Sequence, residues 1–159
     1  MKDRSIAPAV DIKILLNWVA FNLLIGNADA HAKNLALLFT EEGPRLAPFY
    51  DMLCTAIYGE LADKLAMKIG GENRPDWIQL RHLERFAQDI GVHSRMVIST
   101  VKGMAEGIVE ASEEVAEKFQ VKYGEKPVVQ KVLSVIKKRS RSVLLTLNAS
   151  PGKTGVEEA

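Results

Sequence analysis

The feature that most constrains the fold of this 159-residue chain is an apolar segment from Ile12 to Ile25. Its aliphatic and aromatic side chains fall at nearly every angle around a helix, so almost no polar face remains for solvent. A helix that is apolar on all sides belongs at the centre of a core. We therefore predict a core helix over 11–25, introduced by Pro8, capped by Asp11 and ended by Gly26 and Asn27.

We do not expect this segment to cross a membrane. A membrane-spanning helix needs roughly 20 apolar residues, and Lys13, Asn17 and Asn22 interrupt this shorter run. The start of the chain is charged and lacks the pattern of a secretory signal. The single cysteine, Cys54, allows no intrachain disulfide and suits a reducing compartment. We therefore expect a cytoplasmic protein without a membrane partner.

The composition indicates one domain with a sizeable core. Hydrophobic residues make up 47% of the chain, and the net charge of +1 gives no overall attraction to nucleic acid or anionic lipid. No internal repeat or domain boundary is visible. We assign residues 1–147 to a single domain and the small, polar residues 148–159 to a flexible tail.

The other sequence patterns predict mainly helices and one hairpin. Strands are expected at 35–40 and 45–49 around the polar turn Glu41-Glu42-Gly43-Pro44. Residues 64–69 alternate as a strand does, and 52–63 stay unassigned. Helices are predicted at 76–90, 94–119 and 127–147.

Several residues in these predicted helices have an expected role. Asp76 is predicted to cap its helix, with Gln79 in the return position of a capping box. The helical spacing places Val115 and Phe119 in the core, and Trp18 and Trp77 are expected there as well. Gly103 and Gly107 are interpreted as small residues that allow another element to pack closely.

A polar loop, 26–34, follows the predicted core helix directly. Asp29 and Asn34 stand five residues apart, which is the spacing in the catalytic loop of protein kinases. In that loop the Asp accepts the proton of the attacking hydroxyl and the Asn holds Mg²⁺. Asp51, after the predicted hairpin, is placed as a second metal-binding carboxylate. The spacing therefore predicts Asp29 as a base and Asn34 and Asp51 as magnesium ligands.

Simpler interpretations exist for each of these residues. Asp and Asn in loops often form Asx turns, and Asp51 at a strand end would then be a turn residue. His31 is a candidate catalytic group that donates a hydrogen bond to the transferred phosphate; as a zinc ligand it would lack partners nearby. Lys33 and Asn34 are the candidates for contacting the bound nucleotide, although Lys33 also fits a solvated loop charge.

Three stretches together resemble the C-terminal lobe of HipA-like kinases, over about residues 10–145. They are Asn22-Leu23-Leu24-Ile25-Gly26-Asn27-Ala28-Asp29-Ala30-His31-Ala32-Lys33-Asn34, Leu46-Ala47-Pro48-Phe49-Tyr50-Asp51 and Leu65-Ala66-Met67-Lys68-Ile69-Gly70-Gly71. These kinases are bacterial serine/threonine protein kinases that serve as the toxins of toxin–antitoxin pairs.

The resemblance implies a mainly α, kinase C-lobe-like domain with a small β-hairpin at the catalytic loop. It also implies ATP as phosphate donor, Mg²⁺ as cofactor and a protein hydroxyl as acceptor. Asp29 would be the catalytic base, with Asn34 and Asp51 as the magnesium ligands, and His31 stands where the family also has a His.

Two departures from the kinase pattern matter. Ala28 stands where protein kinases have the Arg that docks a phosphorylated activation loop. The phosphate-covering loop and the nucleotide-gripping Lys belong to an N-terminal lobe, and only eleven residues precede Ile12. We therefore expect the N-terminal lobe to be a missing partner and the 159 residues alone to be inactive, as a fragment, a truncated product or one half of a split protein.

Two further functions fit the sequence. The chain could be a non-catalytic interaction module that binds an antitoxin-like DNA-binding protein or an N-terminal lobe in trans. It could also be a helical nucleic-acid binder, because its last predicted helix is basic, although a solvated face explains those charges more simply. The basic residues concerned are Lys131, Lys137, Lys138, Arg139 and Arg141.

Overall fold

The fold of the described residues, 4–59 and 64–149, is given by a computed structural model. These residues form four α-helices: α1 (Pro8–Ile25), α2 (Leu80–Ile90), α3 (Ser94–Tyr123) and α4 (Pro127–Asn148). They also form one antiparallel sheet of two strands, β1 (Leu37–Thr40) and β2 (Gly43–Leu46). The prediction of a mainly helical domain with a small β-hairpin is confirmed.

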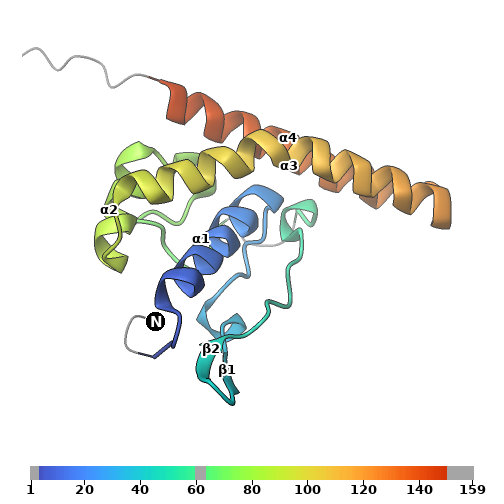
Figure 1. The fold of residues 1–159 in the computed structure, drawn as a ribbon. Coiled ribbons are helices and arrows are strands. Elements are labelled where there is room, and N and C mark those ends of the chain that lie inside the picture. Colours follow the sequence, from blue (N-terminus) through green and yellow to red (C-terminus); the bar gives the residue numbers. More distant parts are fainter. Residues whose placement is uncertain (1–3, 60–63, 150–159) are drawn as a thin grey trace, which may run out of the picture.

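The helices gather around α1 (Figure 1). The long helices α3 and α4 lie side by side, and both contact α1, while the hairpin projects away from this pair (Figure 1). The core is made of buried aliphatic side chains from all four helices. Leu16, Leu23 and Leu24 of α1 lie at its centre, which confirms the predicted core helix.

The first helix is longer than predicted. It begins at Pro8 instead of Asp11, and by length and composition alone its 18 residues could cross a membrane. This helix is longer than the run from Ile12 to Ile25, so its length alone does not exclude a membrane span. The leucines of α1 are buried among the other helices, so its apolar character is that of a core helix.

Asp11 is not a helix cap. It lies within the first turn of α1, with its carboxylate fully buried. Arg45 Nη2 donates to Asp11 Oδ1 at 2.9 Å, the N–H of Leu46 donates to Oδ2 at 2.9 Å, and Ser5 donates to the same oxygen. The hydrogen bonds from Arg45 and Ser5 hold the pKa of Asp11 well below its usual range. This carboxylate therefore fixes β2 to the start of α1.

Three predicted elements differ from those in the structure. The hairpin turns tightly at Glu41-Glu42, because Thr40 pairs with Gly43 and Pro44 already belongs to β2. Residues 64–69 form no strand; Ile69 makes only an isolated bridge with Glu72. Helix α2 begins at Leu80 with Gln79 as its cap, since residues 75–77 form a short 3₁₀ turn instead of continuing the helix.

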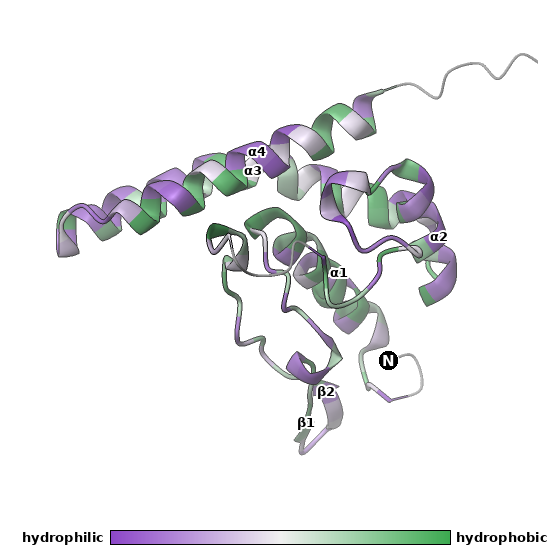
Figure 2. Cartoon of the chain, turned by 180° about the vertical axis from the view of Figure 1, so that it is seen from behind, coloured by the Kyte–Doolittle hydropathy of each residue, from purple (hydrophilic) through white to green (hydrophobic). Residues whose placement is uncertain are grey.

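The outer end of the α3–α4 pair is less buried than the periodicity predicts. Val115 is 66% exposed and Phe119 is also exposed, because this end extends past the other elements (Figure 1). Figure 2 shows hydrophobic and hydrophilic residues alternating along it. Gly103 and Gly107 face open space, with no atom within 4 Å of an added Cβ, so the predicted close packing there is wrong.

The remaining predictions have mixed outcomes. Trp18 is buried as expected, whereas Trp77 is 59% exposed and is not a core residue. The predicted tail begins one residue too early, because α4 includes Asn148. Residues 150–159 of that tail, and 60–63 of the unassigned segment, lie outside the described residues.

Candidate active site

The candidate catalytic loop, residues 26–34, begins at a glycine that no other residue could replace without strain. Gly26 has a φ of 77°, and its N–H donates to the carbonyl of Asn22, which ends α1. A Cβ at this position would lie 2.8 Å from both Ala56 Cβ and Val135 Cγ1. The positive φ and the close packing together require glycine.

Asn27 is the central hydrogen-bonding residue of this loop. Its buried Nδ2 donates to Asn22 Oδ1 at 2.8 Å and to the Asp51 carbonyl at 3.1 Å, and its Oδ1 accepts from the N–H of Asp29 at 3.1 Å. Sequence reasoning missed this role, because it assigned Asn27 to ending the helix at positive φ. Among the described non-glycine residues, only Asp51 has a positive φ.

Thr55 holds the start of the loop from the opposite side. Its hydroxyl accepts from the N–H of Ala28 at 2.7 Å and donates to the carbonyl of Gly26 at 3.1 Å. The N–H of Ala66 donates to the carbonyl of Ala28 at 2.8 Å. No local pattern in the sequence marks Thr55 for this role, since its partners lie about 27 residues earlier in the chain.

The structure brings Asn34 and Asp51 together. Asn34 Nδ2 donates to Asp51 Oδ2 at 3.1 Å, across 17 positions of sequence. Asn34 Oδ1 accepts from the N–H of His31 at 3.0 Å, which fixes the amide so that its nitrogen faces the carboxylate. Asn34 is buried and Asp51 is exposed, with a φ of 59°. The two predicted ligands therefore meet at the surface from opposite sides of the hairpin.

In the same loop, Asp29 is exposed and His31 is half-buried. The Asp29 side chain is 71% exposed, and its Oδ1 lies 3.8 Å from His31 Nε2. A protonated His31 would form an ion pair with Asp29 at this distance. The side chain of Lys33 is exposed, and the carbonyl of Lys33 accepts a hydrogen bond from the Tyr50 hydroxyl at 2.9 Å.

Asp51 and Asn34 carry the type of oxygen ligand that a magnesium ion prefers. Within 4–59 and 64–149, no three His, Cys, Asp or Glu side chains gather closely enough to hold a metal. Asp51 has a carboxylate oxygen beyond the one that accepts from Asn34, whereas Asn34 Oδ1 accepts from the N–H of His31 and the amide nitrogen is the atom that faces the carboxylate. Mg²⁺ needs only one or two such protein ligands, because water and substrate phosphates complete its octahedron.

Comparison with known sequences places this loop in a family. The profile of the HipA-like C-terminal domain matches residues 2–116, which include Asp29, Asn34 and Asp51. The chain belongs to the HipA-like C-terminal domain family. The predicted resemblance is thereby confirmed, and the described fold is that of a C-terminal domain from a family of kinase toxins.

Two relatives show how much of a HipA-like protein this chain covers. It is 37% identical over 113 residues to Y4mE of Sinorhizobium fredii, a protein named as a kinase. The match covers 71% of this chain and 27% of Y4mE. It is 37% identical over 101 residues to the serine/threonine-protein kinase toxin HipA of Shewanella oneidensis, covering 64% of this chain and 23% of HipA. The matched region thus spans about a quarter of these relatives.

A solved structure supports the same fold. The chain aligns with HipA of Shewanella oneidensis, determined in complex with HipB and operator DNA, at a TM-score of 0.67 and 29% identity. The alignment covers 88% of this chain and 32% of HipA. The helical arrangement and the hairpin therefore agree with the HipA fold.

Proposed function

We propose that residues 1–147 form the C-terminal lobe of a HipA-like serine/threonine protein kinase and carry its phosphate-transfer residues. The complete enzyme would move the γ-phosphoryl group of ATP to a hydroxyl on a protein substrate. Asp29 would act as base, while Asn34 and Asp51 would bind Mg²⁺. The 3.1 Å contact between Asn34 and Asp51 is the observation that carries this proposal, because it joins two predicted ligands from separate segments.

The exposed carboxylate of Asp29 suits a base that must reach an incoming hydroxyl. As the acceptor oxygen bonds to the γ-phosphorus, the bond to the leaving ADP breaks and the hydroxyl proton passes to Asp29. His31, 3.8 Å away, would orient this carboxylate or donate to the transferred phosphate. The bound Mg²⁺ would neutralise charge on the phosphates. Lys33, on the same loop, is a candidate for contacting the nucleotide.

The apolar surface beside this site supports docking of an N-terminal lobe. All four residues of β1 are exposed, and Phe39 is the most exposed of its apolar side chains. Further exposed apolar residues follow the hairpin at Tyr50, Met52 and Leu53. Several large apolar side chains exposed in one part of a protein are typical of an interaction site. We propose that the N-terminal kinase lobe covers it and completes the ATP site.

The catalytic proposal is tested in the protein joined to an N-terminal lobe. Transfer of labelled γ-phosphate from ATP to protein should fall by at least about 10²-fold in Asp29→Asn, because the base is lost. Asp51→Asn should raise the Mg²⁺ concentration required for half-maximal transfer. Asp89→Asn on α2 is the matched control, since it removes an exposed carboxylate elsewhere. Activity in Asp29→Asn equal to that of the control would refute the assignment.

The isolated 159-residue chain should transfer no phosphate by itself, because the nucleotide-gripping groups come from the other lobe. Robust Mg²⁺-dependent transfer by this chain would contradict that expectation.

A non-catalytic docking role is the second candidate, favoured by the same exposed β1 surface. An antitoxin-like DNA-binding protein is one expected partner, since HipA of Shewanella oneidensis was solved with HipB and operator DNA. Size-exclusion chromatography with either partner, using Phe39→Ser to weaken the apolar surface, tests this role. Docking would be favoured over catalysis if a complex forms and if Asp29→Asn leaves phosphate transfer unchanged.

A further inference from the structure

A second site candidate lies between the Pro75–Trp77 turn and α4. The cleft has a volume of about 460 Å³. It is built from four separate parts of the chain and contains no residue of the 26–34 loop. Its lining residues are Ala56, Lys64, Arg74, Pro75, Asp76, Trp77, Val135, Lys138 and Arg139.

Positive charge dominates this cleft. Lys64 comes from the loop before the Ile69–Glu72 bridge, whereas Lys138 and Arg139 come from α4. Asp76 is the one acidic side chain among the lining residues that the structure describes. Arg74 adds little net charge, because its Nε and Nη2 bond to the two carboxylate oxygens of Glu72 at 2.9 and 2.8 Å. The two lysines, Lys64 and Lys138, therefore favour an anionic ligand.

The cleft also presents an aromatic surface. Trp77 is 59% exposed, which is unusual for so large an apolar side chain. The Arg74 guanidinium carbon lies 3.7 Å from the Trp77 ring centroid, and the pair with Glu72 holds that guanidinium in place. The indole is therefore fixed by a cation–π contact while much of its surface remains accessible.

We propose that this cleft binds a nucleoside phosphate, with the base stacked on Trp77 and the phosphate held by Lys64 and Lys138. Fixed aromatic rings beside basic side chains are the combination that binds nucleotides without base-specific hydrogen bonds. The nucleoside phosphate would be either a free nucleotide or one unit of a single-stranded nucleic acid. This inference does not depend on the proposed kinase activity.

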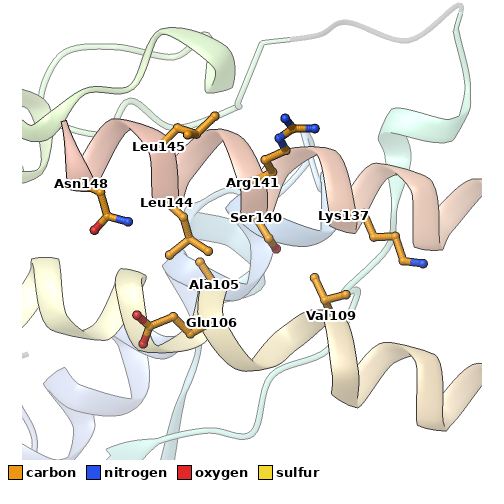
Figure 3. A pocket seen from close by; sticks show the side chains of 9 residues that line it. All are labelled: Ala105, Glu106, Val109, Lys137, Ser140, Arg141, Leu144, Leu145 and Asn148. Atoms are coloured by element: carbon orange, nitrogen blue, oxygen red, sulfur yellow. The ribbon is translucent and has the colours of Figure 1, made fainter.

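A comparable cleft on the opposite side of α4 lacks these features. It measures about 400 Å³ and lies between α3 and α4, where Ala105, Ser140 and Leu144 face one another (Figure 3). Its cations, Lys137 and Arg141, are accompanied by Glu106 in the lining, and Lys137 also pairs with Glu113. No aromatic side chain lines it. The basic residues of α4 are therefore divided between two clefts, and Arg141 supplies a matched control for Lys138.

The test is fluorescence anisotropy at low salt with two probes, labelled adenosine monophosphate and a labelled short single-stranded RNA. Trp77→Leu should weaken binding by about tenfold, and Trp77→Phe should restore most of it, because the phenyl ring still stacks. The double variant Lys64→Gln/Lys138→Gln should weaken binding to a similar degree. Arg141→Gln should leave binding within about twofold, and circular dichroism would verify that each variant folds.

The two probes distinguish the sources of the ligand. Equal affinity for both probes would identify a free nucleotide, whereas much tighter RNA binding with a steep salt dependence would identify a single strand. The proposal is overturned if neither probe binds at low salt, or if Arg141→Gln weakens binding as much as the cleft variants do. It is also overturned if inorganic phosphate competes as well as unlabelled adenosine monophosphate, since the base would then make no contribution.

Discussion

Arg45 of β2 holds the buried carboxylate of Asp11 in α1 through two nitrogens, with Nε and Nη2 at 3.1 and 2.9 Å from Oδ1. The other end of α1 leads through Gly26 into the candidate catalytic loop. The hairpin that separates Asn34 from Asp51 is thus fixed to the start of the helix whose end positions Asp29. The core helix therefore sets the relative placement of both halves of the site.

Asp11→Asn should lower the free energy of unfolding at pH 7, because the amide cannot pair with the guanidinium of Arg45. The pKa of Asp11 lies below its usual value in the folded state. Its stabilising effect is therefore complete above the ordinary carboxyl pKa, near 4, and declines as the pH falls further toward the folded-state pKa. Urea unfolding at pH 7 and pH 3 should show a smaller difference between the two proteins at pH 3. An equal difference at both pH values would contradict this role.

Gly26→Ala should destabilise the protein by at least about 1–2 kcal/mol, because an L-residue there is forced into a left-handed conformation. Its Cβ would also lie 2.8 Å from Ala56 Cβ and Val135 Cγ1. Gly103→Ala is the matched control: this glycine lies within α3 and faces open space, so alanine should stabilise by about 0.5–1 kcal/mol. Thermal denaturation of both variants should give shifts of opposite sign, and shifts of the same sign would contradict the packing described at Gly26.

Asn27→Ala should disorder the candidate catalytic loop by removing a side chain bonded to Asn22, Asp29 and Asp51. Leaving buried polar partners unsatisfied costs about 1–3 kcal/mol. In the protein joined to its N-terminal lobe, phosphate transfer should also fall while the affinity for the protein substrate changes little, since Asn27 positions other residues. Hydrogen exchange should increase at the amide of Asp29. Unchanged exchange at this amide would refute the positioning role.

Leu24→Ala should cost about 2–5 kcal/mol, because Leu24 is fully buried in the cluster shared by α1, α3 and α4. Val121→Ala, on the outer end of α3, should change stability by less than about 0.5 kcal/mol, since Val121 is 88% exposed. Denaturant titrations would measure both values. A large loss in Val121→Ala would mean that another part of the protein covers the outer end of the α3–α4 pair.

Helical periodicity in the sequence predicted burial correctly where another element covers the apolar face of the helix. The all-round apolar character of α1 placed it in the core, and Leu83 and Ala87 of α2 are buried as their spacing indicates. The same reasoning failed at Val115 and Phe119, because helical periodicity shows which residues share a face and not whether another element covers that face. It failed at Trp77 for a similar reason, since a turn held by Arg74 keeps this side chain at the surface.

Local patterns predicted the four helices, the hairpin, their order and the spacing of Asp29, Asn34 and Asp51, because helix periodicity and motif spacing are local properties. The contact of Asn34 with Asp51, the support of the loop by Asn27 and Thr55, and the pairing of Arg45 with Asp11 arise from long-range folding. These contacts join residues 17 to 34 positions apart. Their formation depends on how the hairpin folds back onto α1, and no local pattern encodes that distance.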